Sequence, residues 1–241
     1  MKNKIDILAI GAHPDDVELG CGGTIIKHIK LGYSIGIIDL SCGELGSRGN
    51  KEIRLEESKI AANFLGIKFR ENLNFEDGFI FSNNKFYQIE LVKKIRKYKP
   101  NIILCNALSD RHPDHSRSAK LVINSSFLSG LNKIETFDKD IKQEIWSPKN
   151  ILHYTQWNTA EPMISIDISQ YIDQKIKLIK IYKSQFYNPK STEIKTKISS
   201  KQFLDSITSR ASDLGRLIGT KYAEGFQSKQ YLKINELSNL I

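Results

Sequence analysis

Two short segments, about a hundred residues apart, contain side chains that commonly bind metal ions. They are residues 12–16, with the sequence AHPDD, and residues 111–115, with the sequence RHPDH. His13 and Asp16 are three residues apart, and so are His112 and His115. Side chains at this spacing on a helical turn face the same way. Together the segments predict a site with three protein ligands and an open position, as in catalytic zinc sites. Iron, manganese and cobalt would suit such ligands as well.

Asp15 gives this predicted metal site a catalytic character. It directly precedes the predicted ligand Asp16, and two adjacent carboxylates cannot easily both face one ion. We therefore interpret Asp15 as a general base for a water activated by the metal. The histidine of the second segment that is not a ligand would polarise a substrate oxygen or protonate a leaving amine, and Asp114 would orient that imidazole. The predicted reaction is metal-assisted hydrolysis of an amide, ester or similar bond.

The elements that must position these segments alternate between apolar strands and amphipathic helices, which predicts an α/β fold. Ligands of open α/β sheets bind at the carboxyl ends of the strands, so both segments are expected at one sheet edge. Without a repeat or a linker, we predict a single domain over residues 1–241. Residues 129–149 are interpreted as a loop or short helix near the pocket mouth. The expected strands are 5–10, 33–40, 68–74, 102–105, 151–154, 163–166 and a return to the sheet within 222–226, and the expected helices are 22–31, 51–65, 84–98, one from residue 114, 170–182 and 200–217.

Composition narrows the class of protein. The 241 residues are 40% hydrophobic and 26% charged, as in ordinary soluble proteins. No run is long and apolar enough to predict a membrane span, and residues 1–6 do not resemble a signal peptide. Three cysteines without a CxxC pair favour a reducing compartment, so we expect a cytoplasmic protein. The net charge of +9 comes from scattered lysines, which favours an anionic small substrate over nucleic acid.

The sequence resembles the zinc-dependent N-acetylglucosaminyl deacetylases of the PIG-L/LmbE-like family. The similarity rests on AHPDDVELGCGG at residues 12–23 and HPDH at residues 112–115. Further segments resemble the subgroup of this family that acts in bacillithiol biosynthesis. These segments are GELGSRG at 43–49, EIRLEE at 52–57, YKSQF at 182–186 and LIGTKYAEGF at 217–226.

This resemblance implies a Rossmann-like three-layer sandwich with a mostly parallel sheet. His13, Asp16 and His115 match the ligands of one zinc ion, and Asp15 matches the general base. His112 matches the histidine that stabilises the oxyanion or serves as acid. The implied reaction removes acetate from N-acetyl-glucosaminyl L-malate. The implied partner is therefore a small amino-sugar conjugate, and homo-oligomers are also an expectation from the resemblance.

Substrate contacts are a separate prediction. Glu44 could accept hydrogen bonds from sugar hydroxyls, or simply cap a loop. Arg48, Arg54 and Arg111 could bind the malate carboxylates, because a guanidinium matches a carboxylate with two parallel hydrogen bonds. Each arginine could equally form a structural ion pair. Tyr222 could line the pocket or close it.

Two other functions remain open from the sequence. The chain could deacetylate a different N-acetylglucosamine conjugate, such as a diacetylchitobiose-like sugar. It could also be a non-catalytic protein that binds a sugar or a metal on the same scaffold. The presence of Asp15 together with His112 argues against the second alternative, since binding alone requires neither.

Overall fold

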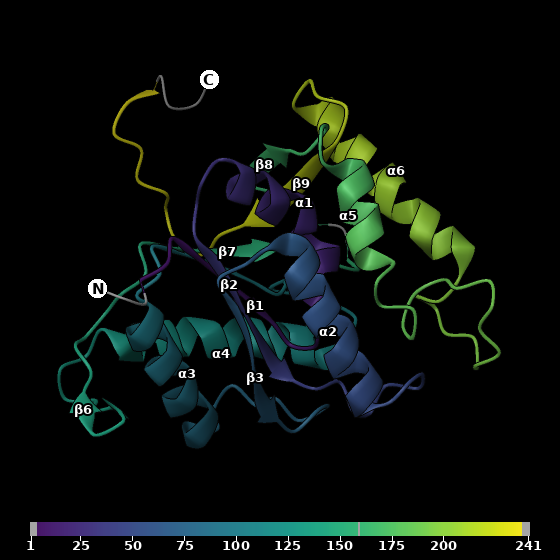
Figure 1. Ribbon diagram of the computed structural model, residues 1–241. Coiled ribbons are helices and arrows are strands. Elements are labelled where there is room, and N and C mark those ends of the chain that lie inside the picture. Colours follow the sequence, from purple (N-terminus) through teal and green to yellow (C-terminus); the bar gives the residue numbers. More distant parts are fainter. Residues whose placement is uncertain (1–3, 159, 238–241) are drawn as a thin grey trace.

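The computed structural model describes residues 4–158 and 160–237, and its centre is a seven-stranded sheet (Figure 1). The order across the sheet is β3-β2-β1-β4-β7-β9-β8. A separate two-stranded ribbon pairs β5 with β6. The strands are β1 (Ile7–Gly11), β2 (Ile35–Ser41), β3 (Phe69–Phe75), β4 (Ile102–Cys105), β5 (Phe137–Asp138), β6 (Ile141–Lys142), β7 (Asn150–Tyr154), β8 (Ile164–Asp167) and β9 (Ala223–Gln227).

The sheet is mostly parallel, as predicted. Strand β1 pairs with β2 on one side and β4 on the other, so Ile7 aligns with both Ile35 and Ile102. Only β9 runs antiparallel to its neighbours, between β7 and β8. Every residue of β1 and β2 is buried, because helices cover both faces of a parallel sheet.

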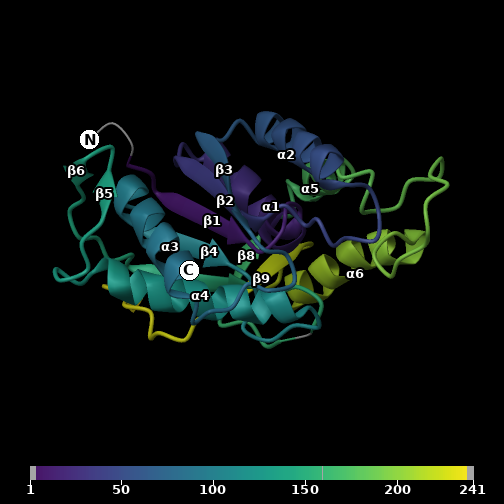
Figure 2. The same cartoon turned by 90° about the horizontal axis from the view of Figure 1, so that it is seen from below.

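The described helices form two layers around this sheet, which confirms the three-layer sandwich (Figures 1 and 2). Helices α3 and α4 pack on one face, where Leu91 and Leu121 join the core. Helices α1, α2, α5 and α6 cover the other face, where Ala61, Leu178 and Leu204 are buried. The helices are α1 (Asp16–Lys30), α2 (Lys51–Leu65), α3 (Lys85–Tyr98), α4 (Pro113–Ser129), α5 (Ile172–Ile179) and α6 (Lys201–Leu217).

Helix α1 begins at Asp16, six residues before the predicted start at residue 22. The prediction located the second half of α1, which follows the non-helical Cys21, but it missed the first turns of the helix. Close contacts with distant residues surround this helix. A Cβ on Gly20 would lie 2.2 Å from Cδ2 of Tyr154, and a Cβ on Gly23 would lie 2.8 Å from Cδ1 of Ile168. The glycines therefore allow the helix to lie close against its neighbours.

The same helix is interrupted at Cys21, whose φ of −143° and ψ of 22° are not helical. The interruption frees backbone N–H groups at the start of the second half of α1. Glu224 on β9 accepts two of them, from Gly23 at 2.9 Å and from Thr24 at 2.7 Å. Lys175 neutralises this buried carboxylate at 2.5 Å. A side chain from the far end of the chain thus caps the second half of the helix.

Residues 129–149 are mostly loop, as predicted, but none of them lines the pocket, so their predicted location near its mouth is wrong. They run from the end of α4 through the β5–β6 hairpin, and Arg96 on α3 donates to three carbonyl oxygens before the hairpin, those of Ser129, Leu131 and Ile134. In Figure 2 this hairpin lies at one end of the molecule, and the loop between α5 and α6 lies at the other. The polar sequence of residues 129–149 does not indicate which part of the sheet this segment lies against.

None of the described helices is both long enough and apolar enough to cross a membrane. Cys21, Cys42 and Cys105 are all free and buried. Residues 1–3, which belong to the segment compared above with a signal peptide, lie outside the described residues.

We expect Gly20→Ala to lower the free energy of unfolding by about 1–3 kcal/mol, because the added methyl would overlap the Tyr154 ring. The ring cannot move away easily, since its hydroxyl donates to the carbonyl of Ile10 at 2.9 Å. Gly22→Ala is the control, as its nearest neighbour is the end of the Leu178 side chain at 3.2 Å. Urea unfolding would measure both variants, and equal losses would contradict the steric explanation.

Candidate active site

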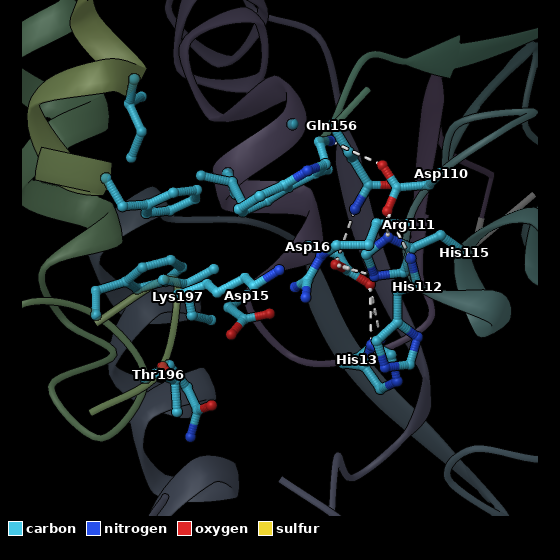
Figure 3. A pocket seen from close by; sticks show the side chains of 18 of the residues that line it. His13, Asp15, Asp16, Asp110, Arg111, His112, His115, Gln156, Thr196 and Lys197 are labelled. Carbon is cyan, nitrogen blue, oxygen red and sulfur yellow. Dashed lines mark hydrogen bonds and ion pairs between the residues drawn. The ribbon is translucent and has the colours of Figure 1, made fainter. Parts of the chain in front are cut away.

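Loops that follow five parallel strands surround a pocket of about 510 Å³. His13 follows β1, Ser47 follows β2, Asp77 follows β3, Asp110 follows β4 and Gln156 follows β7. The pocket therefore lies at the carboxyl edge of the sheet, where the sequence predicted it. Residues of the α5–α6 loop and of α6 close its other side (Figure 3).

The Asp16 carboxylate lies at the centre of the polar side of this pocket. Oδ1 is 3.0 Å from Nε2 of His115 and accepts a hydrogen bond from Gln156 at 2.9 Å. Oδ2 accepts from the backbone N–H of His13 at 3.0 Å and from Asn106 at 3.1 Å, and it lies 3.4 Å from Nδ1 of His13. Burial raises the pKa of a carboxyl, but His115 and His13 outweigh it and hold the pKa of Asp16 well below its usual range.

Each of the two neighbouring histidines is held by a second carboxylate on the ring nitrogen that faces away from Asp16. Nε2 of His13 lies 2.9 Å from Asp77, and Nδ1 of His115 lies 2.8 Å from Asp110. Such carboxylate–histidine pairs orient metal ligands in many proteins. With protons on these nitrogens, His13 presents Nδ1 and His115 presents Nε2 to the same carboxylate. The predicted ligands His13, Asp16 and His115 are thus brought together.

The charges of this cluster fit a cation. Burial opposes protonation of His13, but Asp114, Asp16 and Asp77 outweigh it and hold its pKa well above the usual range. Burial also opposes protonation of His115, but Asp16 and Asp110 raise its pKa to about 9. The acids therefore require positive charge at the ring nitrogens, which a divalent ion would supply in place of the protons. One nitrogen from each of His13, His112 and His115 lies within 4.8 Å of the others, so His112 could also reach such an ion.

Asp15 lies beside this cluster and lines the pocket. Its φ of 117° is rare for a residue other than glycine, and strained backbone of this kind is common at functional sites. Burial raises its pKa to about 7, although the Arg54 guanidinium, 2.8 Å away, partly offsets this effect. A carboxyl with a pKa near neutrality suits the predicted general base.

His112 caps helix α4, and its Nδ1 accepts a hydrogen bond from the backbone N–H of Asp114 at 3.3 Å. Burial and the neighbouring His13 and His115 lower the pKa of His112 to about 4. A neutral ring that accepts at Nδ1 carries its proton on Nε2, where it can donate to a substrate oxygen. The expected contact with Asp114 differs, because the fully buried Asp114 carboxylate accepts from Gly78 at 2.6 Å instead.

The arginines predicted to bind substrate have different surroundings. Arg54 donates to Asp15 and to the carbonyl oxygens of Pro14 and Gly43. Arg48 donates to the carbonyl oxygens of Ser184 and Ile194 in the α5–α6 loop. Both line the pocket, but their guanidinium groups are already engaged within the protein.

The remaining predicted contacts divide between the pocket and its surroundings. Arg111 lines the pocket, and its guanidinium lies 4.4 Å from the centre of the Trp157 ring. Glu44 is exposed and accepts from the backbone N–H of Asp77 at 3.1 Å, outside the pocket lining. Tyr222 also lies outside that lining and packs beside Ile168.

Sequence reasoning missed four polar residues that contact the predicted metal ligands His13, Asp16 and His115. Asp77 and Asp110 follow β3 and β4, so their position after predicted strands was a signal that could have found them. Asn106 and Gln156 had no such signal, since an amide in a loop suggests no particular partner. They became recognisable only once β4 and β7 were seen to be neighbours.

We expect Asp77→Ala to weaken zinc binding by about 10–100-fold, because Asp77 orients His13 and raises its basicity. Calorimetric titration of the metal-depleted protein with zinc would measure the change. Asp205→Asn, on the exposed surface of α6, is the control. Unchanged affinity in Asp77→Ala would contradict the role of this carboxylate.

Two relatives of known or assigned activity are similar to this chain over most of its length. It is 30% identical over 190 residues to diacetylchitobiose deacetylase of Thermococcus kodakarensis, covering 75% of this chain and 70% of that protein. It is 24% identical over 231 residues to a Bacillus anthracis protein named "Probable N-acetyl-alpha-D-glucosaminyl L-malate deacetylase 2", covering 90% of this chain and 94% of that protein.

A solved structure and a family model agree with these similarities. The crystal structure of the conserved protein TT1542 from Thermus thermophilus has a TM-score of 0.83 and 31% identity, and it covers 96% of this chain and 98% of that one. The family model described as "PIG-L: GlcNAc-PI de-N-acetylase" matches residues 8–126, which include both histidine segments. The chain belongs to the PIG-L/LmbE-like deacetylase family.

Proposed function

We propose that this protein is a zinc-dependent hydrolase that removes the acetyl group from N-acetyl-glucosaminyl L-malate, a step of bacillithiol biosynthesis. The family supports the coarser part of this proposal, a deacetylase of N-acetylglucosamine-type substrates. The malyl conjugate is the finer part. Its support comes from the sequence resemblance and from the malate deacetylase name of the Bacillus anthracis relative.

One observation carries the hydrolase proposal. The pairs His13–Asp77 and His115–Asp110 present their opposite ring nitrogens to Asp16, while Asp15 lines the pocket next to them. A protein that only bound a sugar would need neither this convergence nor a buried second carboxyl. His13, Asp16 and His115 would hold the ion, which when bound would activate a water and polarise the acetyl carbonyl.

The protein groups then account for the proton transfers. Asp15 accepts a proton from the water whose oxygen attacks the acetyl carbon. The Nε2–H of His112 donates to the carbonyl oxygen as negative charge develops there. Asp15 returns its proton to the nitrogen as the C–N bond breaks, which yields acetate and a free amino sugar. Arg54, at 2.8 Å, keeps the Asp15 carboxylate in place.

A second candidate substrate is diacetylchitobiose, because the relative from Thermococcus kodakarensis is named for it and has the higher identity of the two relatives. Acetate release from the malyl conjugate, from diacetylchitobiose and from methyl N-acetylglucosaminide would distinguish the candidates. We expect the highest kcat/KM for the malyl conjugate. A higher value for diacetylchitobiose would overturn the malyl proposal and leave the deacetylase proposal intact.

We also propose a cytoplasmic location. The three free and buried cysteines support a reducing compartment. A homo-oligomer remains a proposal from the resemblance, which sedimentation of the purified protein would test.

We expect Asp15→Asn to lower kcat for acetate release by about 100–10,000-fold, because an amide cannot take the proton from water. Asparagine tolerates a positive φ better than most residues, so the turn should keep its shape. The zinc content, measured by atomic absorption, should stay near one ion per chain.

Asp110→Asn is the matched comparison. Asp110 contacts His115, whereas Asp15 is the proposed acceptor of the proton from the attacking water. We expect that variant to lose metal affinity more than kcat at saturating zinc. Full activity in Asp15→Asn would show that another group is the base.

A further inference from the structure

Six arginine and lysine side chains line the pocket, and four of them form hydrogen bonds or ion pairs within the protein. Arg48 holds backbone carbonyls, and Arg54 holds Asp15. Lys175 pairs with Glu224, and Arg210 donates to the carbonyl of Trp157. The two others, Lys197 and Arg111, are therefore the ones that could meet a ligand without breaking an existing hydrogen bond.

Lys197 has no side-chain hydrogen bond or ion pair with any residue in the described ranges 4–158 and 160–237, although it lines the pocket. Figure 3 shows its side chain extending from the α5–α6 loop toward Asp15. Nothing in the sequence singled it out, because it is one of several lysines in a polar stretch. Only the folded structure shows that the Lys197 side chain points into the pocket.

The loop that carries Lys197 is tied to the body of the protein. Arg48 donates to the carbonyl oxygens of Ser184 at 2.8 Å and Ile194 at 3.1 Å, so it joins two parts of the loop. Glu193 accepts from the backbone N–H of Gly49 at 2.7 Å. The backbone N–H of Thr196 donates to Ser199 at 2.8 Å. These contacts fix the backbone on both sides of Lys197, whose exposed side chain lines the pocket.

Arg111 presents a second cation from a different loop. Its guanidinium lies over Trp157, whose other contacts include a ring stack with Phe203 at 5.7 Å. The backbone N–H of Trp157 donates to Asp110 at 2.7 Å. Arg111 is exposed and its side chain makes no hydrogen bond within the described part of the chain. The pocket thus carries two positive groups that are not paired with any residue in the described part of the chain.

We propose that Lys197, together with Arg111, binds the carboxylates of an acidic group joined to the amino sugar, so that Lys197 determines specificity for anionic conjugates. This inference rests on the proposed function for the sugar part of the ligand. An unpaired ammonium and an unpaired guanidinium complement a dicarboxylate, whereas a neutral second sugar would leave both without a counter-charge. Lys197 differs in this respect from Arg48 and Arg54, whose guanidinium groups form hydrogen bonds within the protein.

Direct binding separates this inference from catalysis. Calorimetry on the zinc-loaded Asp15→Asn protein would compare N-acetyl-glucosaminyl L-malate with methyl N-acetylglucosaminide. We expect Lys197→Met in this background to weaken binding of the malyl conjugate by about tenfold, the loss of one charge-assisted hydrogen bond. Binding of the neutral glycoside should be unchanged. Lys195→Met is the matched control, because Lys195 is on the same loop, exposed and outside the pocket lining.

Each outcome bears on the inference. Equal binding of the malyl conjugate by Lys197→Met and Lys195→Met would overturn it, as would an absence of malyl binding to the protein with Lys197 intact. An equal loss of affinity for both ligands would also overturn it, since that would show a general effect on the pocket rather than recognition of the carboxylates. Selective malyl binding that depends on Lys197, in a protein that releases no acetate from any conjugate, would support the inference and refute the proposed function.

Discussion

A buried carboxylate must find hydrogen-bond donors, and Asp16 is the residue at which this requirement shapes the molecule. Its donors come from the loops after β1, β4 and β7, namely His13, Asn106 and Gln156. His115, on α4, supplies a further contact. These loops can meet only if β1, β4 and β7 lie side by side, as the sheet order provides.

A second group of buried charges holds helix α1, which begins at Asp16. Glu18, two residues after Asp16 on α1, lies 2.5 Å from Arg70 on β3. Arg70 also forms a two-pronged ion pair with Asp39 on β2, and Tyr182 donates to Glu18 at 2.8 Å. Removing one member of such a network leaves an uncompensated buried charge. Helix α1 is thus fixed by polar contacts to β2 and β3 as well as by its apolar face.

Much of this organisation could be predicted from the sequence, because it depends on local patterns. Apolar strands followed by His13 and by His112 predicted one sheet edge, and the structure brings them together there. The first turns of α1 were missed because the contact of Gly20 with Tyr154 comes from a distant segment. Local propensity contains no information about such neighbours.

The substrate contacts were harder for a related reason. An arginine that binds a ligand and an arginine that ties down a loop look the same in a sequence. Arg48 and Arg54 proved to be engaged within the protein, while Lys197 proved to be free among the described residues. Which cation remains available depends on the hydrogen bonds of all the others, and this can be judged only after folding.

The cap that Glu224 places on helix α1 has a consequence for the order of assembly. Residues 22–24, next to the first histidine segment, are synthesised some two hundred residues before Glu224, their hydrogen-bond acceptor. Until that strand leaves the ribosome, the interrupted helix has uncapped N–H groups at its break. The pocket therefore cannot be completed before β9 has been made, however early its first histidine segment is synthesised.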